Sequence, residues 1–240
     1  MASSNLTRGQ ALMQTVKAYG IDTVFGMPGV HTLEYYRGIS DADMRHVLFR
    51  HEQGGGFMAD GYARISGKPA VCCVITGPGV TNIATAVGNA YADSQPMLVI
   101  ASTNGSGDLG AGRGRLHEIT DQLAVIKPLT AFAQTIHDGR QIPGAINRAF
   151  DIFATGRPRP CYIELPIDKI AEAAEFAVET SPIAGPMRPA EESIEKAAAV
   201  ASGARKPVII AGGGVLDHGA ALQALAEKLG AAVILTIAAK

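Results

Sequence analysis

The sequence has 240 residues, of which 47% are hydrophobic and 18% are charged, and its formal net charge at pH 7 is −1. This balance excludes the basic excess typical of nucleic-acid-binding proteins, and no apolar run approaches the roughly 20 residues of a membrane span. The opening residues are polar and lack the apolar core of a signal peptide, so we expect a cytoplasmic protein without a nucleic-acid or membrane partner.

Short apolar runs that suit buried strands alternate with segments of helical periodicity. The expected strands cover residues 23–25, 47–49, 71–75, 97–101 and 161–165. The expected helices cover residues 6–19, 33–39 and 83–91 and the neighbourhood of Phe150. A further helix is expected after the three glycines at 54–56, with apolar residues Phe57, Met58, Tyr62 and Ile65. Strands that alternate with helices through glycine-rich turns predict an α/β fold, a parallel sheet with helices on both faces, over residues 1–170.

The composition changes after this region. Residues 171–189 contain three prolines and scattered acids, which is typical of an interdomain linker. Residues 190–240 then show helices at 194–201 and 220–229, a buried strand at 207–211 and another strand at 232–237. Two strands do not close a parallel-sheet domain, so we expect a truncated second α/β domain in a fragment of a longer polypeptide. A short module that completes its sheet in an oligomer is the alternative.

The three cysteines lie in apolar, strand-like runs and lack the CxxC spacing of zinc or redox sites. Cys72 and Cys73 are neighbours on one strand and should point to opposite faces of the sheet. We therefore predict that Cys72, Cys73 and Cys161 are buried, reduced thiols.

One acid, Glu52, lies at a position where a functional side chain is expected. It follows the apolar run at 47–49, so it falls at the carboxyl end of a parallel strand, where open α/β sheets bind ligands. The glycines at 54–56 cost the helix roughly 1 kcal/mol each relative to alanine, which suggests a close approach to the backbone. An acid between apolar segments tends toward a raised pKa, which suits proton transfer. The alternative is a helix-start acid that complements the dipole, with glycines that fit a packed neighbour.

Other motifs have simpler explanations. The GxGxxG match at 105–110 lacks the helix that the dinucleotide fingerprint requires, so a surface loop is expected there. Glycines 212–214 lie between a strand and a helix, where tight turns also use them. His31 and His117 follow strand ends, where hydrogen-bonded loop histidines are common. Spacing such as HExxH is missing from the sequence, so no residue is predicted to bind a metal.

Four ordered motifs together resemble one family. They are GMPG at 26–29, RHEQGGGFMADGYAR at 50–64, TGPGVTN at 76–82 and RPRPCYIELPIDK at 157–169. This set is similar to the thiamine-diphosphate-dependent 2-keto acid enzymes, the group of acetolactate synthase and the related decarboxylases. The resemblance covers about residues 6–170 as their pyrimidine-binding domain, and KPVIIAGGG at 206–214 resembles the opening of their central, Rossmann-like domain.

The resemblance implies roles for individual residues. It gives Glu52 the catalytic bond to the pyrimidine ring of thiamine diphosphate, where a neutral acid gives a proton to a ring nitrogen. The cofactor-binding residues that it implies are Glu52 together with Pro28, Gly29, Thr76, Pro78 and Asn82.

The resemblance also implies a substrate region. Val30 and His31 match a loop near the reacting substrate. His117 stands where acetolactate synthases usually carry glutamine, which favours a decarboxylase. The segments 28–39 and 113–122 look most like decarboxylases of a guanidino keto acid, 5-guanidino-2-oxopentanoate, from arginine breakdown.

The family's cofactor and assembly imply partners outside this chain. Family members hold the diphosphate and Mg²⁺ with a GDG motif in a third domain, and GDG does not occur in this sequence. Each active site is shared between two subunits, so we expect a homodimer or homotetramer and a chain that is inactive by itself. The small-residue surfaces at 54–56 and 83–92 predict dimerisation near the Glu52 helix.

Some alternatives stay open. The whole protein is a thiamine-diphosphate-dependent 2-keto acid decarboxylase or an acetolactate synthase that condenses pyruvate. A third possibility is a non-catalytic assembly or ligand-sensing module with the same fold. The sequence also leaves open whether FAD binds the central domain.

Overall fold

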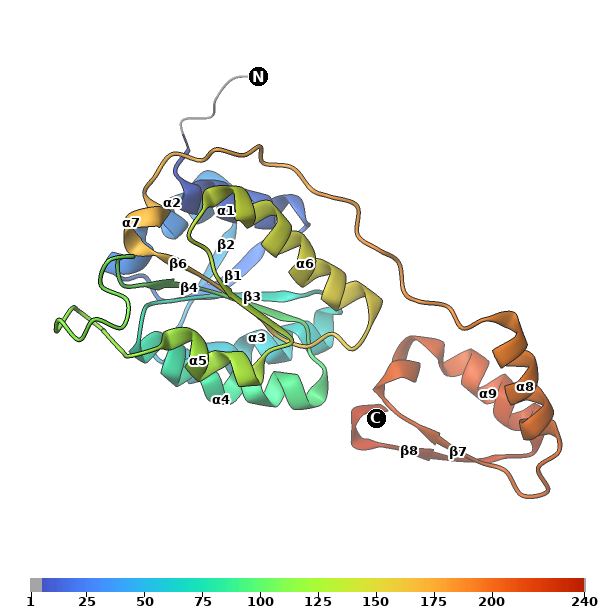
Figure 1. Cartoon of the computed structure of the whole chain (residues 1–240). Helices are drawn as coiled ribbons and strands as arrows, with labels where there is room; N and C mark the ends of the chain where they lie inside the picture. Colours follow the sequence, from blue (N-terminus) through green and yellow to red (C-terminus); the bar gives the residue numbers. More distant parts are fainter. Residues whose placement is uncertain (1–5, 240) are drawn as a thin grey trace. The chain divides into compact units, whose positions relative to one another are not determined.

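The chain forms two compact units in the computed structural model, which describes residues 6–239. The first unit extends to Pro186 and the second begins at Met187. Within the described residues, the first unit contains a sheet of six parallel strands in the order β2-β1-β3-β4-β6-β5 (Figure 1). The strands are β1 (Thr23–Gly26), β2 (Arg45–Leu48), β3 (Ala70–Val74), β4 (Met97–Thr103), β5 (Phe132–Thr135) and β6 (Cys161–Pro166).

Helices cover both faces of this sheet, which confirms the predicted fold (Figure 1). One face carries α1 (Arg8–Ala18), α2 (Leu33–Asp41), α6 (Ile142–Thr155) and α7 (Ile167–Ile170). The other face carries α3 (Glu52–Ser66), α4 (Pro78–Asp93) and α5 (Gln122–Ile126). Short 3-10 helices are η1 (Val30–Thr32), η2 (Lys127–Leu129) and η3 (Gly139–Gln141).

Side chains alternate along the strands and fill a separate core on each face. On β3, Val71 and Cys73 face α1, α2 and α6, whereas Cys72 and Val74 face α3 and α4. This alternation is the period of two that a pleated strand imposes. Cys72, Cys73 and Cys161 are buried free thiols, as predicted.

Local sequence fixes where helices begin. At α1, Thr7 and Gln10 form a capping box, in which each side chain accepts a hydrogen bond from the other residue's backbone N–H. At α4, Pro78 takes the first helical position, where its missing N–H costs nothing. The helix predicted at 83–91 therefore begins at Pro78, and most of the TGPGVTN motif is helical.

The strand before Glu52 differs from the prediction. We expected a buried strand at 47–49, but β2 runs from Arg45 to Leu48 and lies at the edge of the sheet beside β1. An edge strand meets a neighbour on one side and solvent on the other. Leu48 is accordingly 60% exposed, while Phe49 leaves the strand and is buried.

The apolar face predicted for the helix after residues 54–56 is also wrong in its orientation. Phe57, Met58 and Ile65 on α3 are exposed. The buried face of α3 consists of small residues and two acids, which are Glu52, Gly55, Gly56, Ala59, Asp60 and Ala63. Small residues let α3 pack closely, so Phe57, Met58 and Ile65 point outward, whereas Tyr62 is half-buried against Phe25.

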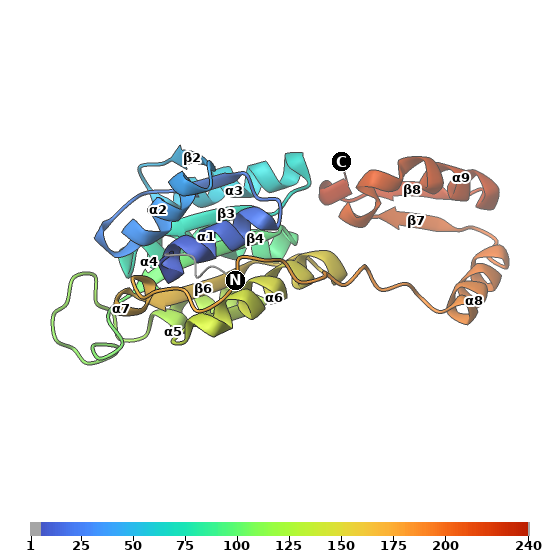
Figure 2. The same ribbon diagram turned by 90° about the horizontal axis from the view of Figure 1, so that it is seen from above.

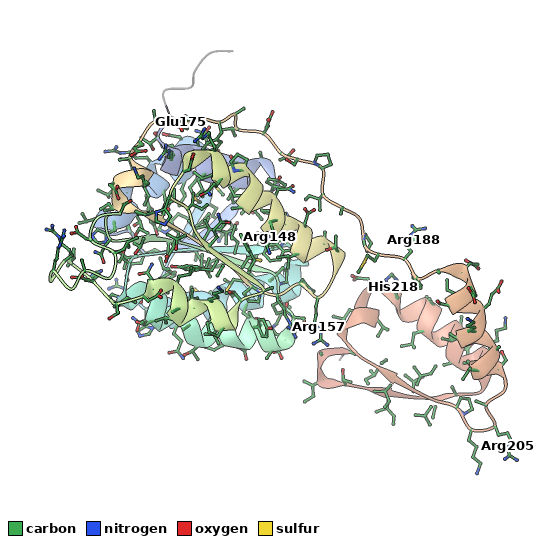
Figure 3. All side chains as sticks on the ribbon, viewed as in Figure 1. Arg148, Arg157, Glu175, Arg188, Arg205 and His218 are labelled. Atoms are coloured by element: carbon green, nitrogen blue, oxygen red, sulfur yellow. The ribbon has the colours of Figure 1, made fainter. Side chains whose placement is uncertain are left out.

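The segment after β6 is tied back to the start of α1. The guanidinium of Arg8, which is 5% exposed, forms ion pairs with Glu172 and with Glu175, which is labelled in Figure 3. The backbone N–H of Ala174 donates to the carbonyl of Leu6 at 2.9 Å. We call residues 172–184 the strap; it passes along α1 and α6 (Figure 2). The N–H of its residue 181 donates to the hydroxyl of Tyr19, just after α1, and the N–H of its residue 184 donates to Asp151 on α6.

The second unit contains α8 (Glu191–Ser202), β7 (Val208–Ala211), α9 (Gly219–Leu229) and β8 (Ala232–Leu235), with 3-10 helices η4 (Gly213–His218) and η5 (Ile237–Ala239). β7 and β8 pair in parallel. The strand predicted at 207–211 is present, but it is not buried as expected, since Val208 and Ile210 are 58% and 72% exposed. The two-stranded sheet, as described, leaves these side chains in solvent.

None of the helices in residues 6–239 combines the length and the apolar character that a membrane crossing requires.

Candidate active site

Four neighbouring strands bring the predicted site residues to one edge of the sheet. β2, β1, β3 and β4 lie side by side and run parallel, so their carboxyl ends share that edge. Glu52 follows β2, Pro28 and Gly29 follow β1, and residues 76–82 follow β3. His117 lies in the long segment between β4 and α5, which extends beyond this edge in both ribbon views (Figures 1 and 2). Ligands of open α/β sheets bind at this edge.

Glu52 is the first residue of α3, and it is only 5% exposed. Its Oε2 accepts a hydrogen bond of 2.9 Å from the side-chain Nδ2 of Asn82, which lies near the start of α4. Its Oε1 has no hydrogen-bond partner among the described residues. The site therefore holds a buried carboxyl group by one oxygen and leaves the other oxygen free to meet a donor or a base.

The glycines after Glu52 explain how Asn82 reaches it. A Cβ at Gly56 would lie 2.5 Å from Cβ of Ala86 and 3.0 Å from Cγ1 of Ile83, both on α4. A Cβ at Gly55 would overlap the ring of Phe49, whereas Gly54 faces open space. Atoms therefore approach two of the three glycines closely, but they belong to the chain itself, which is the alternative of glycines that fit a packed neighbour. The glycines let α3 and α4 pack so closely that Asn82 meets Glu52.

His31 and Thr76 form a second group at the same edge. His31 is 8% exposed, and its Nδ1 lies 2.9 Å from Oγ1 of Thr76, which in turn lies 3.0 Å from Oγ of Ser102. Burial, with a smaller contribution from the charge of His117, lowers the pKa of His31 from 6.5. His31 is therefore held as a neutral ring near pH 7.

His117 faces His31 across this edge. Its ring centroid lies 6.1 Å from that of His31 in an edge-on arrangement. Its backbone takes a left-handed φ of 59°, and its carbonyl oxygen occupies the space that a Cβ at Gly77 would need. The Nδ1 of His117 is buried and has no hydrogen-bond partner among the described residues. One ring nitrogen without a partner in residues 6–239 therefore lies where the loops after β1 and β4 meet.

The remaining predicted residues lie at the rim. Pro28, Val30 and Pro78 are exposed, and Val30 is 65% exposed. In residues 6–239, no hydrogen bond joins the Glu52–Asn82 pair to the His31–Thr76 pair. The structure thus brings the predicted residues together as two groups on one edge.

A buried polar cluster behind the turn at Gly77 was missed in the sequence. Gln122, Tyr162 and Glu164 are each at most 5% exposed and are joined by hydrogen bonds of 2.6–3.0 Å. An acid inside the apolar run CYIELP was a signal that could have identified Glu164. Nothing local pointed to Gln122, because its partners are 20 to 45 residues away in sequence.

The described residues hold no group of three or more His, Cys, Asp or Glu side chains that is arranged to bind a metal ion.

Comparison with known proteins gives the same picture of the first unit. Residues 6–125 match the profile of the family described as thiamine pyrophosphate enzyme, N-terminal TPP binding domain. A probable 2-ketoarginine decarboxylase of Pseudomonas aeruginosa is 53% identical over 237 residues, which are 98% of this chain and 42% of that protein. The acetolactate synthase isozyme 1 large subunit of Escherichia coli is 36% identical over 227 residues, 92% of this chain and 40% of that protein. The acetolactate synthase of Mycobacterium bovis is 34% identical over 247 residues, 100% of this chain and 40% of that protein. The chain thus spans about two fifths of the length of these relatives.

Proposed function

The chain belongs to the thiamine pyrophosphate enzymes, and from that premise we propose that it supplies the pyrimidine-binding side of an active site that decarboxylates or carboligates 2-keto acids. The observation that carries this proposal is the buried Glu52, held at 2.9 Å by Asn82 at the carboxyl edge of a parallel sheet. Its low exposure distinguishes it from Glu34, the acid at the start of α2, which is only half-buried.

The residues at this edge fit an aminopyrimidine ring. Such a ring presents nitrogen atoms that accept or donate hydrogen bonds, and Oε1 of Glu52 has no partner among the described residues. Asn82 fixes the carboxyl group, so its free oxygen keeps one direction. The ring would be held by Glu52 and lined by Pro28, Gly29, Thr76, Pro78 and Asn82.

Glu52 has a chemical role that its surroundings support. Its free oxygen can give a proton to a ring nitrogen and take it back, and only 5% of the residue is exposed to the water that would compete for that proton. Thiamine diphosphate supplies the electron sink that stabilises the carbanion left when CO₂ departs. We propose that Mg²⁺ and the diphosphate are held outside this chain, as in the family's third domain.

The proposed substrate is a 2-keto acid with a guanidino side chain. The 53% identity to a relative named as a probable 2-ketoarginine decarboxylase supports this class over pyruvate, since the two acetolactate synthases compared here are only 34–36% identical. We place the reacting end of the substrate near Val30, His31 and His117. The ring of His31, which is neutral near pH 7, and the ring of His117 facing it are the side chains proposed to donate to or accept from the keto acid.

The proposed partner is a second copy of the chain. The small-residue surfaces at 54–56 and 83–92, on which a dimer contact was expected, pack largely against each other within the chain. Phe57, Met58 and Ile65 instead form an exposed apolar surface on α3, the helix that begins with Glu52. A subunit packed there would cover this surface and stand next to the candidate site. The buried free thiols at Cys72, Cys73 and Cys161 support a reducing compartment, so we propose the cytoplasm.

The decisive experiment is Glu52→Gln in the complete enzyme. The amide keeps the size of the side chain and its contact with Asn82, but it cannot exchange the proton, so kcat should fall by about 100-fold or more. Glu192→Gln, at a side chain that is 77% exposed, is the matched control. Product analysis with a guanidino 2-keto acid and with pyruvate separates the decarboxylase from acetolactate synthase. An unchanged rate in Glu52→Gln would instead support a non-catalytic module with the same fold.

A further inference from the structure

The buried carboxylate of Glu164 is surrounded by neutral donors. It lies on β6, is 3% exposed, and accepts hydrogen bonds from Nε2 of Gln122 at 2.7 Å, from the hydroxyl of Tyr162 at 2.6 Å and from the hydroxyl of Thr135 at 2.6 Å. Burial and the charge of Glu164 raise the pKa of Tyr162, so its hydroxyl remains a donor. These contacts orient every polar group around the carboxylate.

Glu164 thereby decides which way the amide of Gln122 points. The NH₂ group of Gln122 faces Glu164 and also the carbonyl of Ser102 at 2.8 Å. Its carbonyl oxygen therefore faces the other way, where it accepts the backbone N–H of Gly77 at 2.6 Å. A flipped amide would set a carbonyl oxygen against the carboxylate and NH₂ against an N–H, so both contacts would become repulsive.

The bond to Gly77 lies at the point where the chain turns from β3 into α4. Gly77 has φ 65° and ψ −104°, a conformation that an L side chain rarely adopts, and it immediately precedes Pro78. The N–H groups before a helix have no partner within the helix, so an outside acceptor fixes the position of the turn. The start of α4 carries Asn82, which meets Glu52.

We infer that Gln122, oriented by Glu164, is a positioning residue for residues 76–82. It touches neither Glu52 nor Asn82, but it sets where α4 begins and so where Asn82 can hold Glu52. This inference rests on the proposed function, which makes that segment part of the cofactor site. The site would then consist of the residues that touch the ring and of a buried layer beneath them, which includes Gln122 and Glu164.

The first test is Gln122→Met in the 240-residue chain, with Gln223→Met, at an exposed position, as the control. Methionine keeps the side-chain length and removes both polar ends. Amide hydrogen exchange at Gly77 should rise about tenfold, the effect of losing one hydrogen bond, while exchange at Val99 inside β4 stays unchanged. The side-chain NH₂ resonances of Asn82 should also shift, an effect that a general loss of packing would not confine to this site. Unchanged Gly77 exchange and Asn82 resonances overturn the inference.

A second variant decides the matter if methionine unfolds the chain. Glu164→Gln frees the amide of Gln122 to flip, so Gly77 exchange should rise several-fold. Exchange at Val99 inside β4 should stay unchanged in this variant. Unchanged exchange at Gly77, or a rise of equal size at Gly77 and at Val99, overturns the inference.

These measurements use the chain without cofactor. If hydrogen exchange contradicts the role of Gln122, the activity measurement on Glu52→Gln is still valid. If that activity measurement contradicts the proposed function, the exchange results are still valid. The two ideas are therefore tested separately.

Discussion

The close packing of α3 on α4 makes Gly56→Ala a sharp test of how the site is built. The added methyl group would lie 2.5 Å from Cβ of Ala86, whereas ordinary contacts begin at 3.4 Å. The two helices must therefore separate by about 1 Å at this point, which moves Asn82 away from Glu52. Their 2.9 Å hydrogen bond would stretch past the distance at which it still counts as one.

The magnitude follows from two opposing effects. Overpacking of this kind costs about 1–3 kcal/mol. The better helix preference of alanine over glycine returns about 1 kcal/mol. Gly54→Ala is the matched control, because no atom lies within 4 Å of a Cβ there, so it should gain about 0.5–1 kcal/mol with nothing to offset it. The two variants should differ by about 1–3 kcal/mol, with Gly56→Ala the less stable.

Urea denaturation followed by circular dichroism, together with thermal melts, measures this difference. For a chain of this size the two variants should melt roughly 2–12 °C apart. In the complete enzyme Gly56→Ala should also bind thiamine diphosphate more weakly than Gly54→Ala does. Equal melting temperatures would show that α3 and α4 are not in the contact described, and the account of how Asn82 reaches Glu52 would be wrong.

Two further predictions concern titration and assembly. Because the pKa of folded His31 lies below 6.5, the folded chain binds that proton more weakly than the unfolded chain does. The free energy of unfolding of the unaltered chain should therefore be highest above pH 6.5 and fall as the pH drops below that value. His31→Gln should lose less of this free energy over the same pH range, and equal pH slopes in urea titrations of the two chains would contradict this. Met58→Asp should abolish a concentration-dependent dimer in light scattering, while Met187→Asp, which alters an exposed methionine in the second unit, should not. A chain that stays monomeric at high concentration would contradict the proposed dimer contact at the α3 surface.

The sequence predicted those parts of the fold that depend on local pattern. β3, β4 and β6 are apolar runs buried on both faces, and such runs identify central strands directly. The apolar run at 47–49 predicted another buried strand, but β2 takes in Arg45 and His46 and lies at the edge, and three apolar letters alone do not distinguish the two cases. α3 was oriented wrongly because hydrophobicity favours burying Phe57 and Met58, whereas the need to approach α4 selects glycine and alanine.

Only those parts of the candidate site that belong to sequence motifs were predicted. Glu52 and Asn82 belong to two recognisable motifs, and the structure brings them into contact across 30 residues of sequence. Gln122 and Glu164 lie 42 residues apart, and their bond depends on β6 lying next to β4 in the sheet. Such a contact comes from topology, which no local spacing specifies.

The strap affects how a pulling force on the chain would reach the first unit. Leu6 and Ala174 are hydrogen-bonded neighbours, and Arg8 forms an ion pair with Glu172 beside them, so the start of α1 lies next to the residues that follow α7. Tension arriving from beyond Pro186 would load the strap's hydrogen bonds at residues 184 and 181 first and these contacts next, before the sheet itself is strained. The same nearness means that a short peptide could join these two points and new chain ends could be cut elsewhere, a circular permutation that leaves the sheet order untouched.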